Sequence, residues 1–425
     1  MKPLIQLSAR QREQGFTLVE VLASTALLIL IMVLVLNTVD QTQKVWTRAS
    51  AKVTQFQSAR NAYESMTSRI GQATLNTYYR AFDENSTEEK STLTYTRDSE
   101  LQFMTGPAEK FFSGTPALAG LSPEPELAYP THGIFFMAPL GFTRERDRSG
   151  PAGLRRFRSV TSALSAAGYF VEYDDDQIVP KFLDDASLVP ERKRFRLMEM
   201  DVPTETLSVY QRPLDKTGGT KRRLRNDPQV LDAKKADYVG MVDKKFTETP
   251  NWVRPLWMQD ALFRMPIPGS GKRYRFLNAH VLAENVVALI VLPKLGPGDR
   301  QTPKRIDELA PNFIYDSWRI IAEAANQREL AARYHLLPPI VQVVMVAVDE
   351  GSGQRIADHY KDKIPDWTAN IFDRAYTEAD FQNNIAQLEE NLAKDPAKIN
   401  YRIFSTDVVI RGSKWSRETN IAIIE

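Results

Sequence analysis

The stretch Gly15-Phe16-Thr17-Leu18-Val19-Glu20 leads directly into an uncharged apolar run, Val21 to Leu36. From Phe16 to Leu36 there are 21 residues, and a helix of that length spans about 31 Å, close to the roughly 30 Å of a bilayer's hydrocarbon core. Glu20 is the only ionisable side chain in this run. A carboxylate inside a membrane helix costs free energy unless a positive group meets it. The stretch therefore predicts a membrane-spanning helix with one charged side chain that needs a partner.

The leader in front of this run differs from an ordinary secretory signal. In such a signal the small-residue cleavage site follows the apolar stretch, whereas here the candidate site, Gly15, precedes it. Cleavage after Gly15 would leave the apolar helix on the mature protein. Lys2, Arg10 and Arg12 outweigh Glu13 in the leader, so the positive-inside rule places residues 1–15 in the cytoplasm and the rest of the chain outside it.

The N-terminal segment closely resembles the prepilin cleavage and methylation motif of type IV pilins and type II secretion pseudopilins. Gly15, Phe16, Thr17, Leu18 and Glu20 all fall in register with that motif, and sixteen uncharged residues follow. The resemblance implies that a prepilin peptidase cuts after Gly15 and methylates the new N-terminus at Phe16. It also implies that Glu20 neutralises a terminal amine, its own or that of an adjacent subunit, in the assembled filament. The alternative is an uncleaved single-pass anchor in which Glu20 is incidental.

Composition agrees with an exported protein that is stabilised by burial. The 425 residues include no cysteine, which excludes a disulfide framework and a thiolate metal site. The 55 basic and 53 acidic residues give a net charge of +2, so no overall field attracts nucleic acid. We expect a single-pass inner-membrane protein with a short cytoplasmic N-terminus and a periplasmic head, with filament association as a second location.

The helical pattern continues beyond the apolar run. No proline interrupts the chain between Pro3 and Pro107, whereas Gly71 and the polar run 83–90 mark the end of a helix. We expect a leader at 1–15, a transmembrane helix at 16–36, an extracytoplasmic helical stalk at 37–76 and a head at 77–425. Apolar side chains recur at helical spacing at Val39, Trp46, Val53, Phe56, Tyr63, Met66 and Ile70.

From residue 92 onward, alternating or short buried runs predict strands. The first two, 92–96 and 100–104, are expected to form a hairpin around Arg97-Asp98-Ser99. The fold class is therefore α+β, pilin-like, with one long N-terminal helix packed on a sheet-rich head. Further strands are expected at 133–137, 169–173, 194–198, 207–210, 281–292, 340–348 and 406–410, and helices at 256–264, 317–334 and 377–394.

A second, narrower resemblance concerns the head. Its sequence blocks are similar to the minor pseudopilin J group and, in two places, to cassette protein C of the verrucomicrobial cassettes. An insertion at about 106–275, longer than a usual J-type head allows, separates the J-like blocks. Those blocks are Leu101-Gln102-Phe103, Leu282 to Leu289, Tyr315-Asp316-Ser317-Trp318 and Leu337 to Val343, and the two cassette-like blocks are Gly168 to Tyr173 and Arg194 to Glu199.

Candidate catalytic and ligand-binding groups form no recognisable motif. Gly269-Ser270-Gly271-Lys272 suggests a phosphate loop, but Pro266 and Arg273 stand where the loop needs Gly and Ser or Thr. We expect a turn there. Asp174-Asp175-Asp176 offers the oxygen ligands of calcium, which some pseudopilins bind, but without a known loop spacing. The four histidines, His132, His280, His335 and His359, belong to no two-histidine metal motif.

Basic clusters concentrate in the expected insertion. Basic patches with nearby aromatic residues can contact nucleic acid. Acidic residues are interleaved with them throughout, so we expect solvated loop charge. The clusters are Arg144 to Arg148, Arg155 to Arg158, Glu191 to Arg194, Lys221 to Arg225 and Lys234-Lys235.

Together these patterns and resemblances predict a structural subunit and not an enzyme. We expect a minor pilin or pseudopilin-like protein without cofactor or metal, whose partners are prepilin peptidase, other pilin-like subunits and the inner membrane, with no nucleic acid. Filaments of this kind serve secretion, adhesion, motility or DNA uptake, and the sequence does not distinguish among these four roles. The alternative function is an extracytoplasmic binding protein or adhesin displayed through a pilin-type anchor, with 106–275 as its binding face. An anchored hydrolase lacks a supporting constellation.

Overall fold

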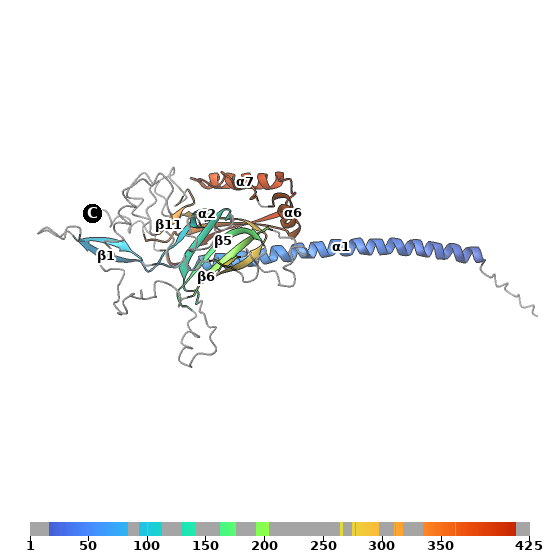
Figure 1. Ribbon diagram of the computed structural model, residues 1–425, viewed down its shortest axis with the longest axis horizontal. Coiled ribbons are helices and arrows are strands. Elements are labelled where there is room, and N and C mark those ends of the chain that lie inside the picture. Colours follow the sequence, from blue (N-terminus) through green and yellow to red (C-terminus); the bar gives the residue numbers. More distant parts are fainter. Residues whose placement is uncertain are drawn as a thin grey trace, which may run out of the picture. The chain divides into compact units, whose positions relative to one another are not determined.

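The computed structural model divides the chain into two compact units, residues 1–55 and residues 56–425, the second of which we call the head. Figure 1 shows the ribbon with its labelled elements. Helix α1 contributes residues to both units. The structure describes residues 17–83, 93–99, 101–112, 129–141, 162–175, 193–203, 264–266, 274–276, 278–296, 310, 312–317, 335–361 and 363–413.

Helix α1 runs without interruption from Leu18 to Ile70, a length of 53 residues. The sequence has neither proline nor glycine in this range, so no residue removes a helical hydrogen bond or loosens the backbone. The helix ends before Gly71, whose N–H still donates to the Thr67 carbonyl oxygen at 3.1 Å. The expected long N-terminal helix is therefore present, and it stops six residues before the expected limit of the stalk at residue 76.

Among the described residues of the head, the largest sheet has six antiparallel strands in the order β11-β3-β4-β5-β6-β9. Strands β4, β5 and β6 lie in its middle, and all three fall within the range 106–275 that we expected as an insertion. This described part of the range therefore belongs to the core of the fold. The strands are β3 (Met104–Pro107), β4 (His132–Ala138), β5 (Ser165–Asp175), β6 (Lys193–Val202), β9 (Ala279–Glu284) and β11 (Tyr315–Asp316).

Both faces of this sheet are buried, which explains why β4 reads as a continuous apolar run. Side chains alternate between the faces of a strand. Ile134 and Phe136 join the main core with α1 and the second sheet. Phe135 and Met137 join a smaller core on the other face, which helix α2 (Ala108–Phe112) also covers. The two-sided burial fixes the register of the strand, because a shift by one residue exchanges its faces.

The second sheet packs against α1 and has the antiparallel order β10-β12-β13. Tyr63 of α1 donates its hydroxyl to the Val343 carbonyl oxygen at 2.7 Å, and its ring lies 5.6 Å from that of Phe404. Helices α6 and α7 complete the main core through buried side chains such as Ile356 and Phe381 (Figure 1). The elements are β10 (Val286–Lys294), β12 (Ile340–Val348), β13 (Tyr401–Val409), α6 (Glu350–Tyr360) and α7 (Glu378–Lys394).

The chain crosses between the two sheets at Asn285, so the single strand expected at 281–292 is in fact two strands. Asn285 has a φ of 58°, a left-handed conformation that Asn tolerates better than most residues. Its N–H donates to the Phe195 carbonyl oxygen at 2.8 Å, and its own carbonyl oxygen accepts from Val348 at 2.9 Å. One residue thus ends β9 in the first sheet and starts β10 in the second.

The outer edge of β10 is covered by side chains from the start of β4. The N–H of Leu289 donates to Thr131 Oγ1 at 3.0 Å, and the N–H of Val291 donates to His132 Nδ1 at 3.1 Å. Burial lowers the pKa of His132 to about 3, so its imidazole is neutral and Nδ1 is free to accept. His132 is thus a structural residue that joins the two sheets.

The expected hairpin of 92–96 with 100–104 is wrong. Strand β2 (Leu93–Asp98) pairs with β1 (Tyr78–Asp83), which the sequence did not suggest, and Met104 belongs to β3 in the six-stranded sheet. A third small pairing joins β7 (Arg264–Pro266) to β8 (Tyr274–Phe276) in antiparallel fashion.

The α+β class, with an N-terminal apolar helix and antiparallel sheets, is confirmed. Strands expected at 133–137, 169–173, 194–198 and 340–348 and the helix at 377–394 are present, and 406–410 corresponds to the end of β13. Helix α6 was not expected. The strand at 207–210, the phosphate-loop-like 269–272 and the helices at 256–264 and 317–334 lie outside the described residues, except that Arg264 belongs to β7 and Ser317 follows β11.

Candidate assembly site in the N-terminal helix

Thr17 and Glu20 form a capping box at the start of α1. The N–H and the hydroxyl of Thr17 both donate to Glu20 Oε2, each at 3.0 Å. The N–H of Glu20 in turn donates to Thr17 Oγ1 at 3.3 Å. Two of the backbone donors that a helix leaves unpaired at its N-terminus are thereby satisfied. The pattern Thr-x-x-Glu before an apolar run is the sequence signature of this arrangement, although Glu20 was expected only in a charge pair.

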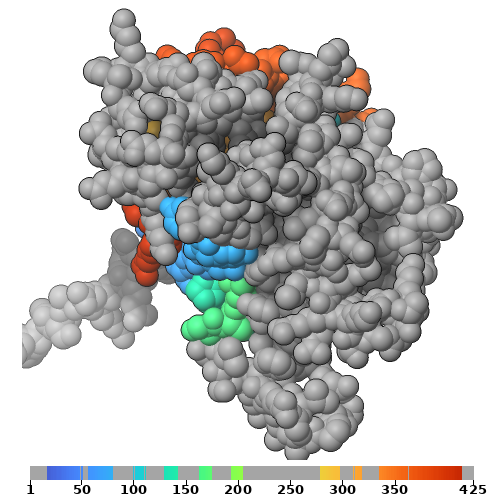
Figure 2. Space-filling view, turned by 90° about the vertical axis from the view of Figure 1, so that its left-hand side faces the viewer, coloured from blue at the N-terminus to red at the C-terminus, as the bar shows by residue number. Residues whose placement is uncertain are grey.

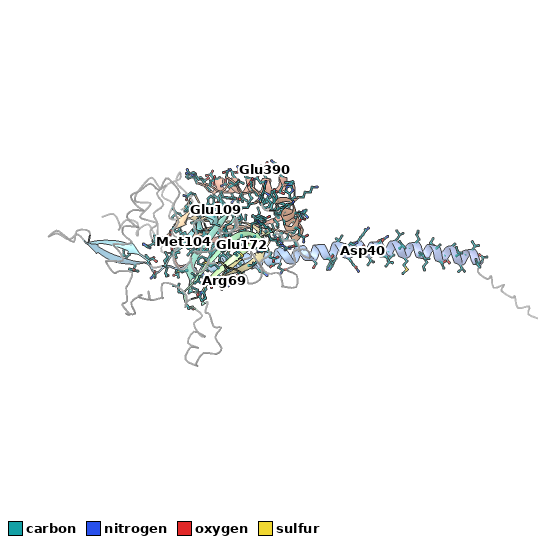
Figure 3. The ribbon with its side chains drawn as sticks, viewed as in Figure 1. Asp40, Arg69, Met104, Glu109, Glu172 and Glu390 are labelled. Carbon is teal, nitrogen blue, oxygen red and sulfur yellow. The ribbon has the colours of Figure 1, made fainter. Side chains whose placement is uncertain are left out.

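The Glu20 carboxylate has a hydrogen-bonding partner but no positive one among the described residues near it. Within residues 17–47 the only basic side chain is Lys44. Its ammonium lies 2.6 Å from Asp40 Oδ2, one helical turn away, and Asp40 projects from the middle of α1 in Figure 3. Gly15 and Phe16, the expected cleavage and methylation residues, lie outside the described residues. The charge of Glu20 therefore remains uncompensated within the described part of α1.

The segment Leu18–Thr47 is long and apolar enough to cross a membrane. Its large apolar side chains are exposed, for example Leu28 at 65 % and Leu34 at 59 %. The hydroxyls of Ser24 and Thr25 donate to backbone carbonyl oxygens three residues earlier, at 2.9 and 3.0 Å. These two hydroxyl groups therefore have hydrogen-bonding partners within the helix, as polar groups need in an apolar environment. The segment can therefore serve as a single-pass membrane anchor.

In the head, a polar cluster centres on Glu199 of β6, whose side chain is 4 % exposed. Arg69, in the last turn of α1, forms an ion pair with Glu199 and lies beside the strands in Figure 3. The Tyr169 hydroxyl donates to Glu199 Oε1 at 2.7 Å, and His280 Nε2 lies 3.3 Å from Oε2. Burial alone would raise the pKa of Glu199, but His280, Tyr169 and Arg69 together lower it. The cluster thus ties the end of α1 to three strands.

The molecular surface also shows the end of α1 next to strands of the six-stranded sheet. In Figure 2 the blue surface of the end of α1 and the residues after it meets the teal and green surface of the segments around β4 and β5. The N–H of Thr74 donates to the Met137 carbonyl oxygen at 2.9 Å in the same region.

The change of the protein's stability with pH should reveal the ion pairs that His280 forms with Glu199 and Asp201. The carboxylates of Asp201 and Glu199 raise the pKa of His280 to about 9, from about 6.5 in an unfolded chain. A raised folded-state pKa contributes stability that is complete below pH 6.5 and is lost as the pH rises through about 9. We expect His280→Gln to be less stable than wild type at pH 6 and nearly equal to it above pH 9.

Chemical denaturation of detergent-solubilised protein at several pH values measures this difference. His359→Gln is the control, because His359 is an exposed residue of α6 whose ring packs edge-on against that of Tyr360 in the same helix. A pH-independent effect of His280→Gln would contradict the assigned ion pairs.

Other charged side chains in the head also form ion pairs that join different strands and helices. Glu172 and Arg196, both fully or nearly buried on adjacent strands, lie 3.5 Å apart. Lys294 of β10 contacts Glu378 at the start of α7 at 2.7 Å and Asp407 of β13 at 3.3 Å. Within the described residues, no group of three or more His, Asp or Glu side chains is arranged to hold a metal ion.

The structure brings together two of the J-like blocks, Leu101-Gln102-Phe103 and the block that begins at Tyr315, and the second of these also contacts Leu336, the residue before the block Leu337 to Val343. The N–H of Phe103 donates to Ser317 Oγ and the N–H of Ser317 donates to the Phe103 carbonyl oxygen, both at 3.0 Å. Gln102 Nε2 donates to Asp316 Oδ1 at 2.8 Å. The Tyr315 hydroxyl donates to the Leu336 carbonyl oxygen at 2.7 Å. These blocks are buried and hydrogen-bonded to one another, which is the pattern of a structural core.

The remaining candidates are only partly described. Asp174 and Asp175 end β5 opposite Arg194 and Lys193 of β6, whereas Asp176 lies outside the described residues. The basic clusters at 144–148, 155–158, 221–225 and 234–235 also lie outside them. Of the remaining histidines, His335 is buried.

Comparisons with protein-family models, with curated proteins and with solved structures found no match.

Proposed function

We propose that the protein is a minor pilin or pseudopilin-like subunit. In this proposal a prepilin peptidase cleaves it after Gly15, and the mature chain joins a type IV pilus-like or type II secretion-like filament or its tip complex. The head lies on the periplasmic side of the inner membrane and the leader on the cytoplasmic side. The role is structural and needs no cofactor or metal.

The observation that carries the proposal is the environment of Glu20. A carboxylate stands at the start of an exposed apolar helix of membrane-spanning length and is held by Thr17. The only basic side chain within Leu18–Thr47 is Lys44, which pairs with Asp40. Such a carboxylate is costly unless a positive group meets it. Cleavage after Gly15 would create that group, the amine of Phe16, four residues before Glu20 in the chain.

A second observation that supports the proposed function concerns the way in which α1 enters the core of the head. The C-terminal part of α1 buries Tyr63, Met66 and Ile70 in the main core of an antiparallel α+β head. One helix thus supplies both the membrane segment and a core element of the head, as a filament subunit assembled by helix packing requires. Its 53-residue length without proline gives a continuous connection between the two.

Processing provides the direct test. We expect the mature protein to start at Phe16, to lose 15 of its 425 residues and to keep 410. Intact mass and N-terminal sequencing of membrane-extracted protein measure this. A mature chain that starts at Met1, or one that lacks the apolar run, would contradict the proposal.

A matched variant separates cleavage from insertion. Gly15→Leu should block processing and leave membrane insertion unchanged, because the apolar run and the leader charges are untouched. Equal processing of the variant and of wild type would show that Gly15 is not the recognised residue. A displayed binding protein or adhesin would also be processed, so assembly with partners, treated in the Discussion, distinguishes the two functions.

A further inference from the structure

The three-stranded sheet has an outer edge on β13, opposite the covered edge of β10. The backbone groups of successive residues in a strand point to opposite sides. At one end of β13 the N–H of Ile410 donates to the Pro339 carbonyl oxygen at 3.0 Å, and at the other end the Asn400 carbonyl oxygen accepts from Asp349 at 3.2 Å. The even-numbered residues of β13 therefore face β12, and the odd-numbered residues face outward.

The outward-facing backbone groups of residues 401–407 have no partner among the described residues, including the N–H groups of Ile403, Ser405 and Asp407. This stretch ends where the N–H of Arg411, another odd-numbered residue, donates to the Gly71 carbonyl oxygen at 3.2 Å. The side chains of Ser405 and Asp407 are exposed. In Figure 2 the deep red surface near the end of the described chain is visible beside the blue surface.

Strand β13 lacks the features that protect many exposed strand edges. Such edges are often short, or they carry a bulge, a proline or a lysine. Strand β13 has nine residues, pairs with β12 in unbroken register and contains neither proline nor lysine. The sheet thus presents its edge on β13 in a form that can accept another strand.

The direction of β13 opposes pairing of this edge with the same edge of a second copy. Thr406 pairs with Val343, whose carbonyl oxygen accepts from Tyr63 of α1, and Arg411 binds Gly71 after the end of α1. Strand β13 therefore runs in the same direction as the last turns of α1. Copies anchored side by side through α1 would have parallel β13 strands, whereas self-complementary pairing of two identical edges is antiparallel.

Arg402 indicates the charge of a strand that would fit this edge. Its guanidinium carbon lies 5.6 Å from the ring centroid of Phe404, and its side chain is exposed. Arg402 forms no ion pair among the described residues, whereas Asp407 is already engaged by Lys294 at 3.3 Å. Opposite charges on neighbouring strands attract, so an added strand gains from a carboxylate beside Arg402.

We propose that the outward edge of β13, residues 401–407, binds an extended segment of a different pilin-like subunit by β-strand addition, with a carboxylate of that segment beside Arg402. Backbone hydrogen bonds supply the affinity of such a contact, and side chains select the partner. The inference rests on the proposed function, because it states how the head meets a neighbouring subunit.

A proline substitution tests the edge. Ser405→Pro removes an outward N–H and no bond to β12, and proline is tolerated on an edge strand in this orientation. Ser405→Ala, which keeps the N–H, is the matched control. The full chain is tagged and co-expressed with the pilin-like proteins encoded beside its gene. We expect Ser405→Pro to lower their recovery from membranes about tenfold, and Ser405→Ala to leave it unchanged.

A charge substitution leaves the backbone of the edge intact. Arg402→Glu should lower the same recovery about threefold, and Arg402→Lys should retain most of it. All four variants should be cleaved after Gly15 like wild type, and chemical denaturation in detergent should show that the Arg402 variants are as stable as wild type.

Hydrogen exchange tests the contact without a substitution. The amides of residues 403, 405 and 407 should exchange about tenfold more slowly in the purified complex than in the protein alone in detergent. The amides of residues 404 and 406, which face β12, should be protected in both states.

Equal exchange in the two states, or wild-type recovery of partners by Ser405→Pro, would overturn this inference and leave the proposed function intact. Slow exchange in the protein alone, with a dimer that Ser405→Pro dissociates, would also overturn it and assign the edge to a second copy. Wild-type protein that recovers no pilin-like partner would overturn the proposed function, and this contact with it.

Discussion

Glu20→Gln should reduce co-purification of the protein with its pilin-like partners by roughly tenfold or more, because an amine that meets Glu20 in the membrane loses its counter-charge. Glutamine can replace glutamate in a capping box, so the contacts with Thr17 and the start of α1 should persist. Membrane insertion and cleavage should also persist. Lowering the salt concentration should not restore assembly, since a pair in a low-dielectric environment is poorly screened.

The control for this variant is Thr17→Ala, which keeps the carboxylate and removes the hydroxyl contacts at 3.0 and 3.3 Å. We expect it to assemble nearly as well as wild type. The measurement is the amount of partner recovered with tagged protein from membranes, normalised to processed subunit. Wild-type assembly of Glu20→Gln would favour a displayed binding protein, and an equal loss in Thr17→Ala would show that Glu20 acts through the helix cap.

Gly168→Ala should destabilise the head by about 1–3 kcal/mol, the usual cost of overpacking a filled core. Gly168 of β5 lies opposite Phe135 of β4. A Cβ at this position would lie 2.3 Å from Phe135 Cδ1 and 2.7 Å from Cε1. The Phe135 ring is fully buried between Phe111, 5.1 Å away, and Phe170, 6.2 Å away. It therefore has no free space into which to move.

Chemical denaturation of the full chain in detergent measures this loss. Gly351→Ala is the control, because an added Cβ in this exposed turn of α6 meets only Arg355 Nη1 at 3.4 Å and Asp349 Oδ1 at 3.9 Å. It should stabilise the protein by up to about 1 kcal/mol, through higher helix propensity. Phe135→Leu combined with Gly168→Ala should recover part of the loss. Unchanged stability of Gly168→Ala would show that β4 and β5 are not packed as described.

The elements with a strong local signal could be predicted from the sequence. Helix α1 lacks proline and glycine, and α7 has both an apolar period and a capping box between Thr377 and Asp380. Helix α6 escaped prediction because Gly351 and Gly353 weaken its pattern. It forms because the Asp349 side chain accepts from the Ser352 N–H at 2.7 Å and Ile356 enters the core.

Strand pairing and the polar cluster could not be read from local patterns. Strand β2 pairs with β1. Nothing in the sequence of either strand favours this pairing rather than a hairpin between β2 and residues 100–104. The Glu199 cluster joins Arg69, Tyr169 and His280, which are far apart in the chain and meet only after the sheet forms. By contrast, the contact between Thr17 and Glu20 is local, and the Thr-x-x-Glu spacing could have predicted it, although Glu20 was expected only in a charge pair.

The covered edge of β10 has a consequence under the proposed function, in which the protein is anchored in a membrane. Chains confined to a surface meet one another at high local concentration, and a bare strand edge there would recruit a strand from a neighbouring copy. The N–H groups of Leu289 and Val291 are already engaged by Thr131 and His132. At these two positions the edge therefore has no free N–H group to which a strand of a neighbouring copy could add.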